Sequence, residues 1–229
     1  MKLLLISSSR VAGTGYLDHC EAQVREHFSD GGRLLFVPYA LADRDGYAKV
    51  ARERFAAMGL TLDSIHQASD PVAAVEQADG VFIGGGNTFR LLKTIQENEL
   101  VAPLRERVRS GMPYMGTSAG TNLAGPTIRT TNDMPIVQPE SFEALCFVPY
   151  QINPHYLDAD PNSTHQGETR EQRLAEFHEE NLTPVVAIRE GAMIVVRDGE
   201  HRIVGTPGGR LFRQGLPTAD LADGARLEL

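Results

Sequence analysis

Residues 114–120 read YMGTSAG, a short apolar run that leads into a serine between two glycines. The apolar run predicts a buried strand, and the glycines allow a tight turn that opens a helix. A strand, a turn and a helix in this order form the repeating unit of an α/β fold with a parallel sheet. The same stretch places Ser118 at the turn, either as an exposed nucleophile or only as a polar residue in a strand-to-helix connection.

The same alternation recurs along the chain. Strands are predicted at residues 2–8, 33–40, 81–85, 113–118, 146–153 and 184–190. Helices are predicted at 15–28, 88–98, 100–111 and 169–181. A further helix is predicted between the first two of these: Val50, Ala51, Phe55 and Met58 share one of its faces, and Gly59 ends it. Residues 192–205 predict a hairpin that turns at Asp198-Gly199. We therefore expect one α/β domain over residues 1–229, a mostly parallel sheet flanked by helices, with antiparallel edge strands near the C-terminus.

Composition narrows the classes of partner. The net charge of −8 is spread along the 229 residues without a basic stripe, which argues against nucleic acid and anionic membranes. The apolar run at residues 3–6 is too short for a signal peptide or a membrane span, so a cytoplasmic location is expected. Cys20 and Cys146 predict buried reduced thiols. No residues have metal-ligand spacing, and we expect no cofactor, a small dipeptide substrate, and a monomer or homodimer.

Ser118 lies in a G-x-S-x-G pattern, in which a strained turn exposes a nucleophilic oxygen after a strand. The N–H of Ala119, directly after the serine, is then one donor to an oxyanion. The glycine-rich loop at residues 84–86, ahead of Asn87, offers a second donor. A phosphate-binding loop and an ordinary glycine turn are the alternatives, although the loop has neither a P-loop ending nor dinucleotide-motif spacing.

A serine nucleophile needs a base and an acid, and strand ends are the places to look for them. Among the histidines, His155 is the one best placed at the end of a strand, and Glu190 ends another. Asp133 and Asp158 compete with Glu190 as the acid. The chain order of an α/β-hydrolase would instead require His201 as the base, but His201 falls in the predicted hairpin.

The polar loop at residues 126–135 follows the serine closely enough to line its pocket. Asp133 can bind a cationic group such as a free α-amine. Arg129 or Arg170 can bind a carboxylate through two hydrogen bonds, although an ordinary surface ion pair is the competing interpretation for Arg170. Asn87 is a further candidate for contact with substrate.

Four segments carry a family resemblance: GGGNTFRLL (84–92), GTSAGTNLAGPTIRTTNDMPI (116–136), INPHY (152–156) and GETREQR (167–173). Together they resemble the aspartyl dipeptidase family of peptidase E, serine peptidases related to cyanophycinase. The resemblance implies a sandwich similar to the class I glutamine amidotransferase-like (flavodoxin-like) fold. It also implies metal-independent hydrolysis of dipeptides that begin with aspartate.

By position, the resemblance makes Ser118 the nucleophile, His155 the base and Glu190 the third member of a triad. It assigns the oxyanion hole to the N–H groups of Gly86 and Ala119. It implies that Arg170 receives the aspartate side chain and keeps Asp133 as a substrate-pocket residue. Thr117 departs from relatives that carry a bulky aromatic residue before the serine, a difference that leaves the triad untouched and bears on the shape of the pocket wall. A hydrolase of aspartyl polymers and a non-catalytic binder of aspartyl ligands remain as alternatives.

Overall fold

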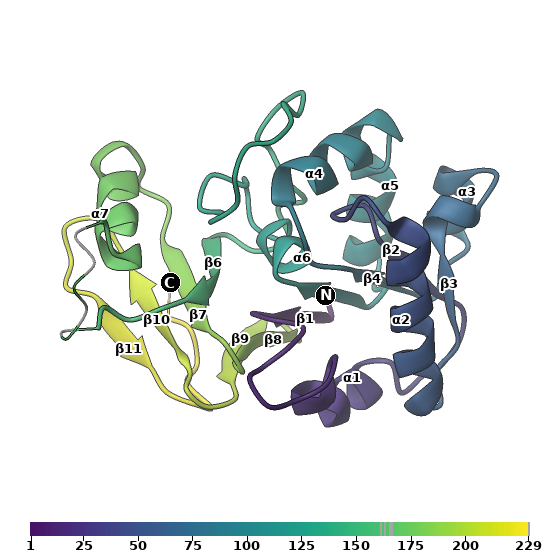
Figure 1. Ribbon diagram of the computed structural model, residues 1–229, viewed down its shortest axis with the longest axis horizontal. Helices are drawn as coiled ribbons and strands as arrows, with labels where there is room; N and C mark the ends of the chain where they lie inside the picture. The colour runs from purple at the N-terminus through teal and green to yellow at the C-terminus, as the bar shows by residue number, and fades with distance from the viewer. Residues whose placement is uncertain (161, 163, 165–166, 229) are drawn as a thin grey trace.

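The computed structural model describes residues 1–160, 162, 164 and 167–228, and its strands form two sheets (Figure 1). The larger sheet has seven strands in the order β3 (Leu62–Ser64), β2 (Leu34–Val37), β4 (Gly80–Ile83), β5 (Tyr114–Thr117), β1 (Leu3–Ile6), β8 (Met193–Arg197) and β9 (Glu200–Val204). The first five strands run parallel to their neighbours, whereas β8 is antiparallel to β1 and β9 is antiparallel to β8. A mostly parallel sheet with an antiparallel edge confirms the fold class predicted from sequence.

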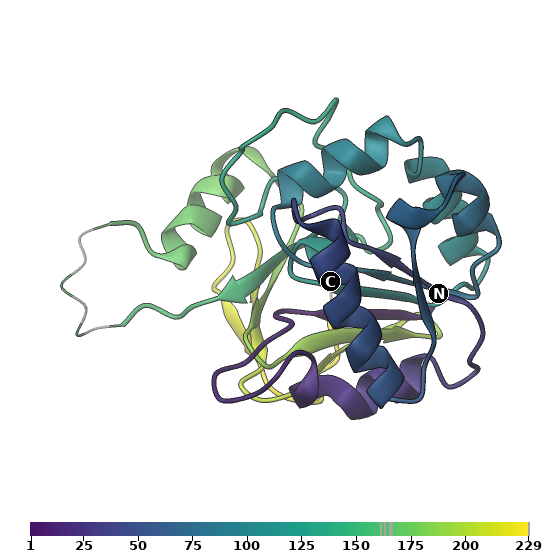
Figure 2. The same cartoon turned by 45° about the vertical axis from the view of Figure 1, so that its right-hand side comes forward.

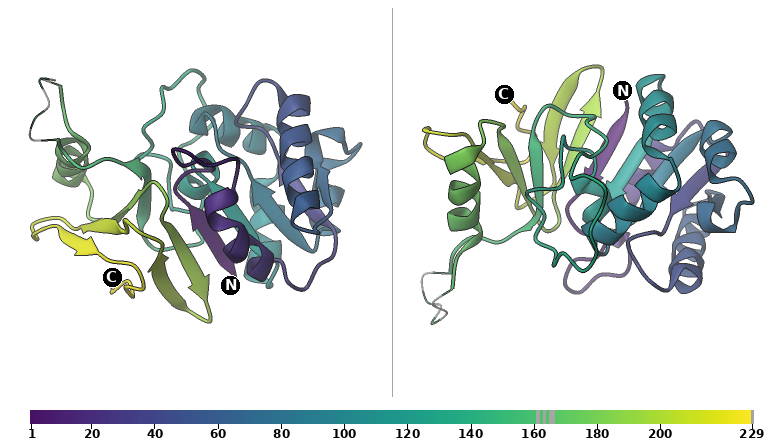
Figure 3. Two further views of the ribbon diagram at one scale, coloured as in Figure 1. Left: turned by 60° about the horizontal axis from the view of Figure 1, so that its bottom comes forward. Right: turned by 90° about the horizontal axis from the view of Figure 1, so that it is seen from above.

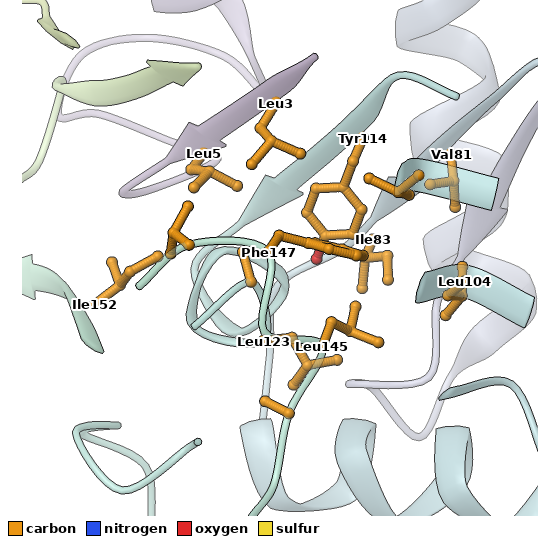
Figure 4. Close-up of a cluster of buried hydrophobic side chains, with 14 of the residues drawn as sticks. Leu3, Leu5, Val81, Ile83, Leu104, Tyr114, Leu123, Leu145, Phe147 and Ile152 are labelled. Atoms are coloured by element: carbon orange, nitrogen blue, oxygen red, sulfur yellow. The ribbon is translucent and has the colours of Figure 1, made fainter. Parts of the chain in front are cut away.

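Helices cover both faces of the larger sheet (Figure 2). They are α1 (Glu21–His27), α2 (Arg44–Ala57), α3 (Pro71–Glu76), α4 (Thr88–Glu97), α5 (Val101–Arg109) and α6 (Ala119–Asn122), with short 3₁₀ turns at Asp18–Cys20 and Ile65–Gln67. In β1, Leu4 and Ile6 pack toward α1 and α2, while Leu3 and Leu5 pack toward α3 to α6. This alternation follows from the two-residue period of a strand. Figure 4 shows the second of these cores around Tyr114 and Phe147.

The edge hairpin forms where the sequence predicts it. Asp198 and Gly199 both have positive φ angles, 52° and 79°, as a tight hairpin turn with right-handed strand twist requires. The turn joins β8 to β9, and the register pairs Met193 with Val204 and Arg197 with Glu200. The antiparallel strands at one edge of the sheet are therefore confirmed.

A second sheet, of four strands, lies beside this edge (Figure 3). The sequence pattern does not separate its strands from those of the larger sheet. Its order is β11 (Ala219–Leu221), β10 (Gly209–Phe212), β7 (Val185–Arg189) and β6 (Gln151–Tyr156), and α7 (Arg170–Glu180) covers one face. Val185 and Ala187 pack toward α7, whereas Val186 and Ile188 belong to the main core. The second sheet is thus joined to the first by buried apolar side chains.

Several local predictions differ from the structure. Val50 is 38% exposed, because it lies about 100° around the helix from Ala51, outside the stripe that buries Ala51 and Phe55. Cys20 is buried as predicted, but Cys146 is exposed: it adopts a φ of 53° and points outward between the buried Leu145 and Phe147. The short strand β3 was not anticipated, and the helix predicted from residue 15 begins as a 3₁₀ turn at Asp18.

No helix in the described part of the chain is long and apolar enough to cross a membrane. The hydrocarbon core of a bilayer needs about 20 predominantly apolar residues. By comparison, α2 has 14 residues and carries several charges.

His27 generates a prediction about acid stability. Its ring is 1% exposed at the end of α1 and packs edge-on against Phe28. Burial, with the nearby charges of Lys2 and Arg197, lowers the pKa of His27 from 6.5 to about 3. The unfolded chain therefore binds one more proton than the folded chain between these values, and stability falls as the pH falls through this window.

The contribution of this group is at most about 1.4 kcal/mol of unfolding free energy per pH unit. We expect His27→Leu to reduce the loss of stability between pH 6.5 and pH 4 relative to the unaltered protein. Urea denaturation at pH 7, 5.5 and 4 measures this, with the pH 7 values separating any packing effect of the substitution. Parallel pH dependences for the two proteins would contradict the prediction.

Candidate active site

Ser118 lies in a strained turn between β5 and α6. Its φ of 50° and ψ of −108° are rare for a residue with a side chain. The flanking glycines make this turn possible, because a Cβ on Gly116 would lie 2.5 Å from the backbone of Gly120, and one on Gly120 would lie 2.1 Å from the carbonyl oxygen of Ile83. The strand, turn and helix predicted from residues 114–120 are all present, although α6 is a single turn.

His155 connects Ser118 to Glu190 through two hydrogen bonds. Its Nε2 lies 2.9 Å from Ser118 Oγ, and its Nδ1 lies 2.7 Å from Glu190 Oε1. An ionised carboxylate only accepts hydrogen bonds, so Nδ1 carries the proton and Nε2 is left to accept the serine hydroxyl. The His155 and Glu190 side chains are 36% and 45% exposed, so substrate and water can reach this chain of hydrogen bonds.

The two residues reach Ser118 from the second sheet. His155 lies near the end of β6 with a φ of 54°, and Glu190 directly follows β7, the parallel neighbour of β6. The pairing of Tyr156 with Arg189, after a shift in register, brings the two strand ends side by side. All three predicted residues therefore lie at strand ends, but on two different sheets.

The competing residues are engaged elsewhere. Asp158 accepts hydrogen bonds from Arg189, at 2.6 and 2.8 Å, and this guanidinium holds the pKa of Asp158 below its usual range. Asp133 accepts hydrogen bonds from the backbone N–H and the hydroxyl of Thr88 at the start of α4. His201 Nδ1 lies 2.9 Å from the hydroxyl of Tyr150. Glu190 is the carboxylate that contacts His155.

Two backbone N–H groups are positioned beside the serine. Within the described residues, the N–H of Gly86 and that of Ala119 donate no hydrogen bond to the protein. The Gly86 backbone has a φ of 136° and passes so close to Ala40 that a Cβ would lie 2.7 Å from the Ala40 carbonyl oxygen. The preceding N–H, from Gly85, donates to the hydroxyl of Tyr47 at 2.9 Å, which ties this loop to α2. Burial raises the pKa of Tyr47, so the phenol stays neutral.

A cavity of about 690 Å³ opens beside these groups. Ser118, His155, Gly85 and Gly86 line it from one side. Its other lining residues come from three segments: the loop after β1 (Arg10, Tyr16), the connection between β2 and α2 (Leu41, Asp43), and the first half of α2 (Tyr47, Val50). The glycine-rich loop and the serine thus share one hollow, as an acyl-transfer site requires.

The four predicted substrate residues lie outside this cavity. Arg170 lines a neighbouring cavity of about 520 Å³ together with Asn132 and Asp158, and a smaller one together with Arg129. Arg129 also lies over the ring of Phe142, at 5.5 Å from the ring centre. Asn87 caps α4 by accepting from the N–H of Arg90, and it donates to the Met134 carbonyl. Asn87 and Asp133 therefore brace the loop at residues 126–135 against α4.

Ser7 is a residue of the site that the sequence did not single out. Its hydroxyl is fully buried, accepts the backbone N–H of His155 at 2.9 Å, and donates to the Ile188 carbonyl at 2.8 Å. Because Ser7 follows β1, this hydroxyl joins β1 of the large sheet to β6 and β7. Its position in the run ISSS, at the carboxyl end of a predicted strand, is the sequence feature that could have marked Ser7 as a site residue.

No group of three or more His, Cys, Asp or Glu side chains in the described ranges is arranged to hold a metal ion.

Comparison with known proteins identifies the family. The model for "Peptidase family S51" matches residues 3–204. The chain is 52% identical to Peptidase E of Streptomyces coelicolor, over 99% of this chain and 93% of that protein. It is 44% identical to a probable alpha-aspartyl dipeptidase of Drosophila melanogaster, over 96% and 93% of the two chains.

Solved structures show the same fold at lower sequence identity. A putative peptidase E from Listeria monocytogenes superimposes with a TM-score of 0.67 at 22% identity, covering 89% of this chain and 98% of that one. A peptidase from an acI-B1 actinobacterium reaches a TM-score of 0.70 at 19% identity, covering 100% and 96%. The family model spans most of the chain and the relatives exceed 40% identity, so the chain belongs to peptidase family S51.

Proposed function

We propose that this serine-type dipeptidase of family S51 removes an N-terminal aspartate from dipeptides, with Ser118, His155 and Glu190 as its catalytic triad. The observation that carries the proposal is the pair of hydrogen bonds, 2.9 and 2.7 Å long, by which His155 joins Ser118 to Glu190. The strained turn at Ser118 supports a nucleophilic role, because such strain is concentrated at functional sites.

The reaction follows from the positions of these groups. His155 Nε2 accepts the proton of the Ser118 hydroxyl as Oγ attacks the carbonyl carbon of the substrate. The N–H groups of Gly86 and Ala119 donate to the oxyanion that forms. The intermediate then expels the amine of the second residue, which takes the proton from His155. A water molecule, deprotonated by the same imidazole, releases aspartate from the acyl-enzyme.

Glu190 acts through the imidazole. Its carboxylate keeps the proton of neutral His155 on Nδ1, which leaves Nε2 free as the base, and it stabilises the positive charge that the ring gains during attack. Ser7 supports the same ring from the backbone side, because its hydroxyl holds the N–H of His155 in a conformation that few non-glycine residues adopt.

Arg170 is the residue that we propose for recognition of the aspartyl carboxylate. Burial, and next the neighbouring charge of Arg173, lowers the pKa of the Arg170 guanidinium, so an incoming carboxylate would relieve an unfavourable charge. Its cavity adjoins the strand end that carries His155, because Asn132 lines this cavity and donates to the Pro154 carbonyl at 2.7 Å. The name of the Drosophila relative, alpha-aspartyl dipeptidase, supports the same preference.

Replacing the nucleophile tests the mechanism. Ser118→Ala removes the attacking oxygen, and we expect kcat/KM for Asp-Leu to fall by several orders of magnitude with little change in circular dichroism. Ser110→Ala, at an exposed serine after α5, is the matched control and should retain full activity. Normal hydrolysis by Ser118→Ala would exclude this serine as the nucleophile.

The acid is tested by a change of one atom. Glu190→Gln lets an amide N–H face His155 Nδ1, which favours the wrong tautomer, and kcat should fall on the order of 10³-fold. Asp158→Asn removes the competing carboxylate and should affect kcat far less. Initial rates with saturating Asp-Leu measure both variants. The opposite ranking would assign the acid to Asp158.

Substrate preference tests the role of Arg170. Among the described residues no carboxylate forms an ion pair with the partly buried Arg170. Such a charge disfavours substrates that lack a carboxylate, so Asp-Leu should be hydrolysed roughly 100-fold faster, or more, than Asn-Leu or Leu-Leu. Arg170→Gln should remove most of this preference, while Arg109→Gln, on an exposed arginine at the end of α5, should keep it. Rates are compared as kcat/KM ratios. A preference that survives Arg170→Gln would place the aspartate elsewhere.

A further inference from the structure

The cavity beside Ser118 has a composition that triad chemistry alone does not require. Away from the serine, its walls are formed by Tyr16, Leu41 and Val50, with the guanidinium of Arg10 at the same hollow. Leu41 and Val50 are both 38% exposed, and both line this cavity. The cavity thus presents an apolar wall and a cation next to a nucleophile.

Arg10 is available to bind an anion. In the part of the chain that the structure describes, no carboxylate lies within 4 Å of its guanidinium. Its guanidinium lies 6.0 Å from the centre of the Tyr16 ring, a distance at which the aromatic face stabilises a cation and limits its directions. Asp43, which also lines the cavity, is engaged at the start of α2, where its Oδ1 accepts the N–H of Gly46 at 2.9 Å.

The geometry of the reaction decides which half of a dipeptide enters this cavity. His155 must protonate the amine that leaves, so the leaving residue lies on the same side of Ser118 as the imidazole. The 690 Å³ cavity contains both Ser118 and His155, whereas the two cavities lined by Arg170 contain neither. The cavity beside Ser118 is therefore the one open to the second residue of the substrate.

We infer that this cavity is the subsite for the leaving residue, that Tyr16, Leu41 and Val50 receive an apolar side chain, and that Arg10 binds its α-carboxylate. The inference rests on the proposed dipeptidase function and deepens it. A dipeptide has its free carboxylate on the residue next to the scissile bond, whereas longer peptides carry an amide there. An arginine that pairs with this carboxylate would select dipeptides by charge and length.

The test compares one substrate with and without the carboxylate. We expect the unaltered enzyme to hydrolyse Asp-Leu with a kcat/KM roughly tenfold to a hundredfold higher than that for Asp-leucinamide, the range of a charge-assisted contact. Arg10→Gln should lower kcat/KM for Asp-Leu by a similar factor, mainly through KM, so that the two substrates become nearly equal. Arg10→Lys should restore part of the difference, because a charge remains without the planar geometry.

Arg44→Gln is the matched control. Arg44 lies at the start of α2, 4.8 Å from the ring centre of Tyr39, outside the cavity lining, so its removal changes the net charge equally. The ratio between the two substrates should stay that of the unaltered enzyme in this variant. Raising the salt concentration should reduce the advantage of Asp-Leu in the unaltered enzyme and leave Arg10→Gln unaffected.

The outcomes separate the subsite from the activity on which it rests. A ratio between Asp-Leu and Asp-leucinamide that Arg10→Gln leaves unchanged would overturn the Arg10 assignment while the dipeptidase activity stands. Equal losses on both substrates would also overturn it, because Arg10 would then serve some group other than the α-carboxylate. Failure of the unaltered enzyme to hydrolyse either substrate would overturn the proposed function together with the subsite.

Discussion

The close approach of the first turn of α6 to the large sheet is the constraint on which the site depends. Gly120 packs against the Ile83 carbonyl at a separation that no side chain could enter, and Gly116 packs against Gly120 in the same way. This contact forces the chain to reverse within one residue, and that residue is Ser118, with its positive φ. The strain is offset by the surrounding packing, since Tyr114, Met115 and Ala119 are all buried. The half-buried hydroxyl of Ser118 and the N–H of Ala119, which donates to no acceptor among the described residues, both follow from this single packing arrangement.

The second requirement is that two sheets meet at a defined distance. Ser118 belongs to the large sheet, while His155 and Glu190 belong to the small one. The Ser7 hydroxyl bonds to β6 and β7 of the small sheet, and Asn122 of α6 donates to the Ile152 carbonyl at 2.7 Å. These bonds are buried, where unmade hydrogen bonds are costly, so they hold the imidazole within reach of the serine more firmly than surface contacts would.

Sequence patterns identified the local units well and their assembly less well. The strand and helix around Ser118 and the hairpin at Asp198-Gly199 each depend on residues that are close in sequence. The three strand-end residues could also be selected, because parallel strands place their ends at one edge. The division of the strands into two sheets could not be predicted from the sequence. The apolar runs of β5 and β7 are similar, and the strands that pair with each of them lie far away in the sequence. The burial of single side chains was also harder to predict, as Val50 and Cys146 show. Whether such a side chain is buried depends on the local direction of the backbone.

The division of the site between two sheets links turnover to folding. In the proposed mechanism, Ser118 and the N–H groups of Gly86 and Ala119 come from the large sheet and its loops, whereas His155 and Glu190 come from the small one. In that mechanism, neither set of groups is active without the other. Hydrolysis therefore begins only when Ser7 and the shared core bring the halves into register, which makes activity a more sensitive gauge of sheet docking than any measure of secondary structure.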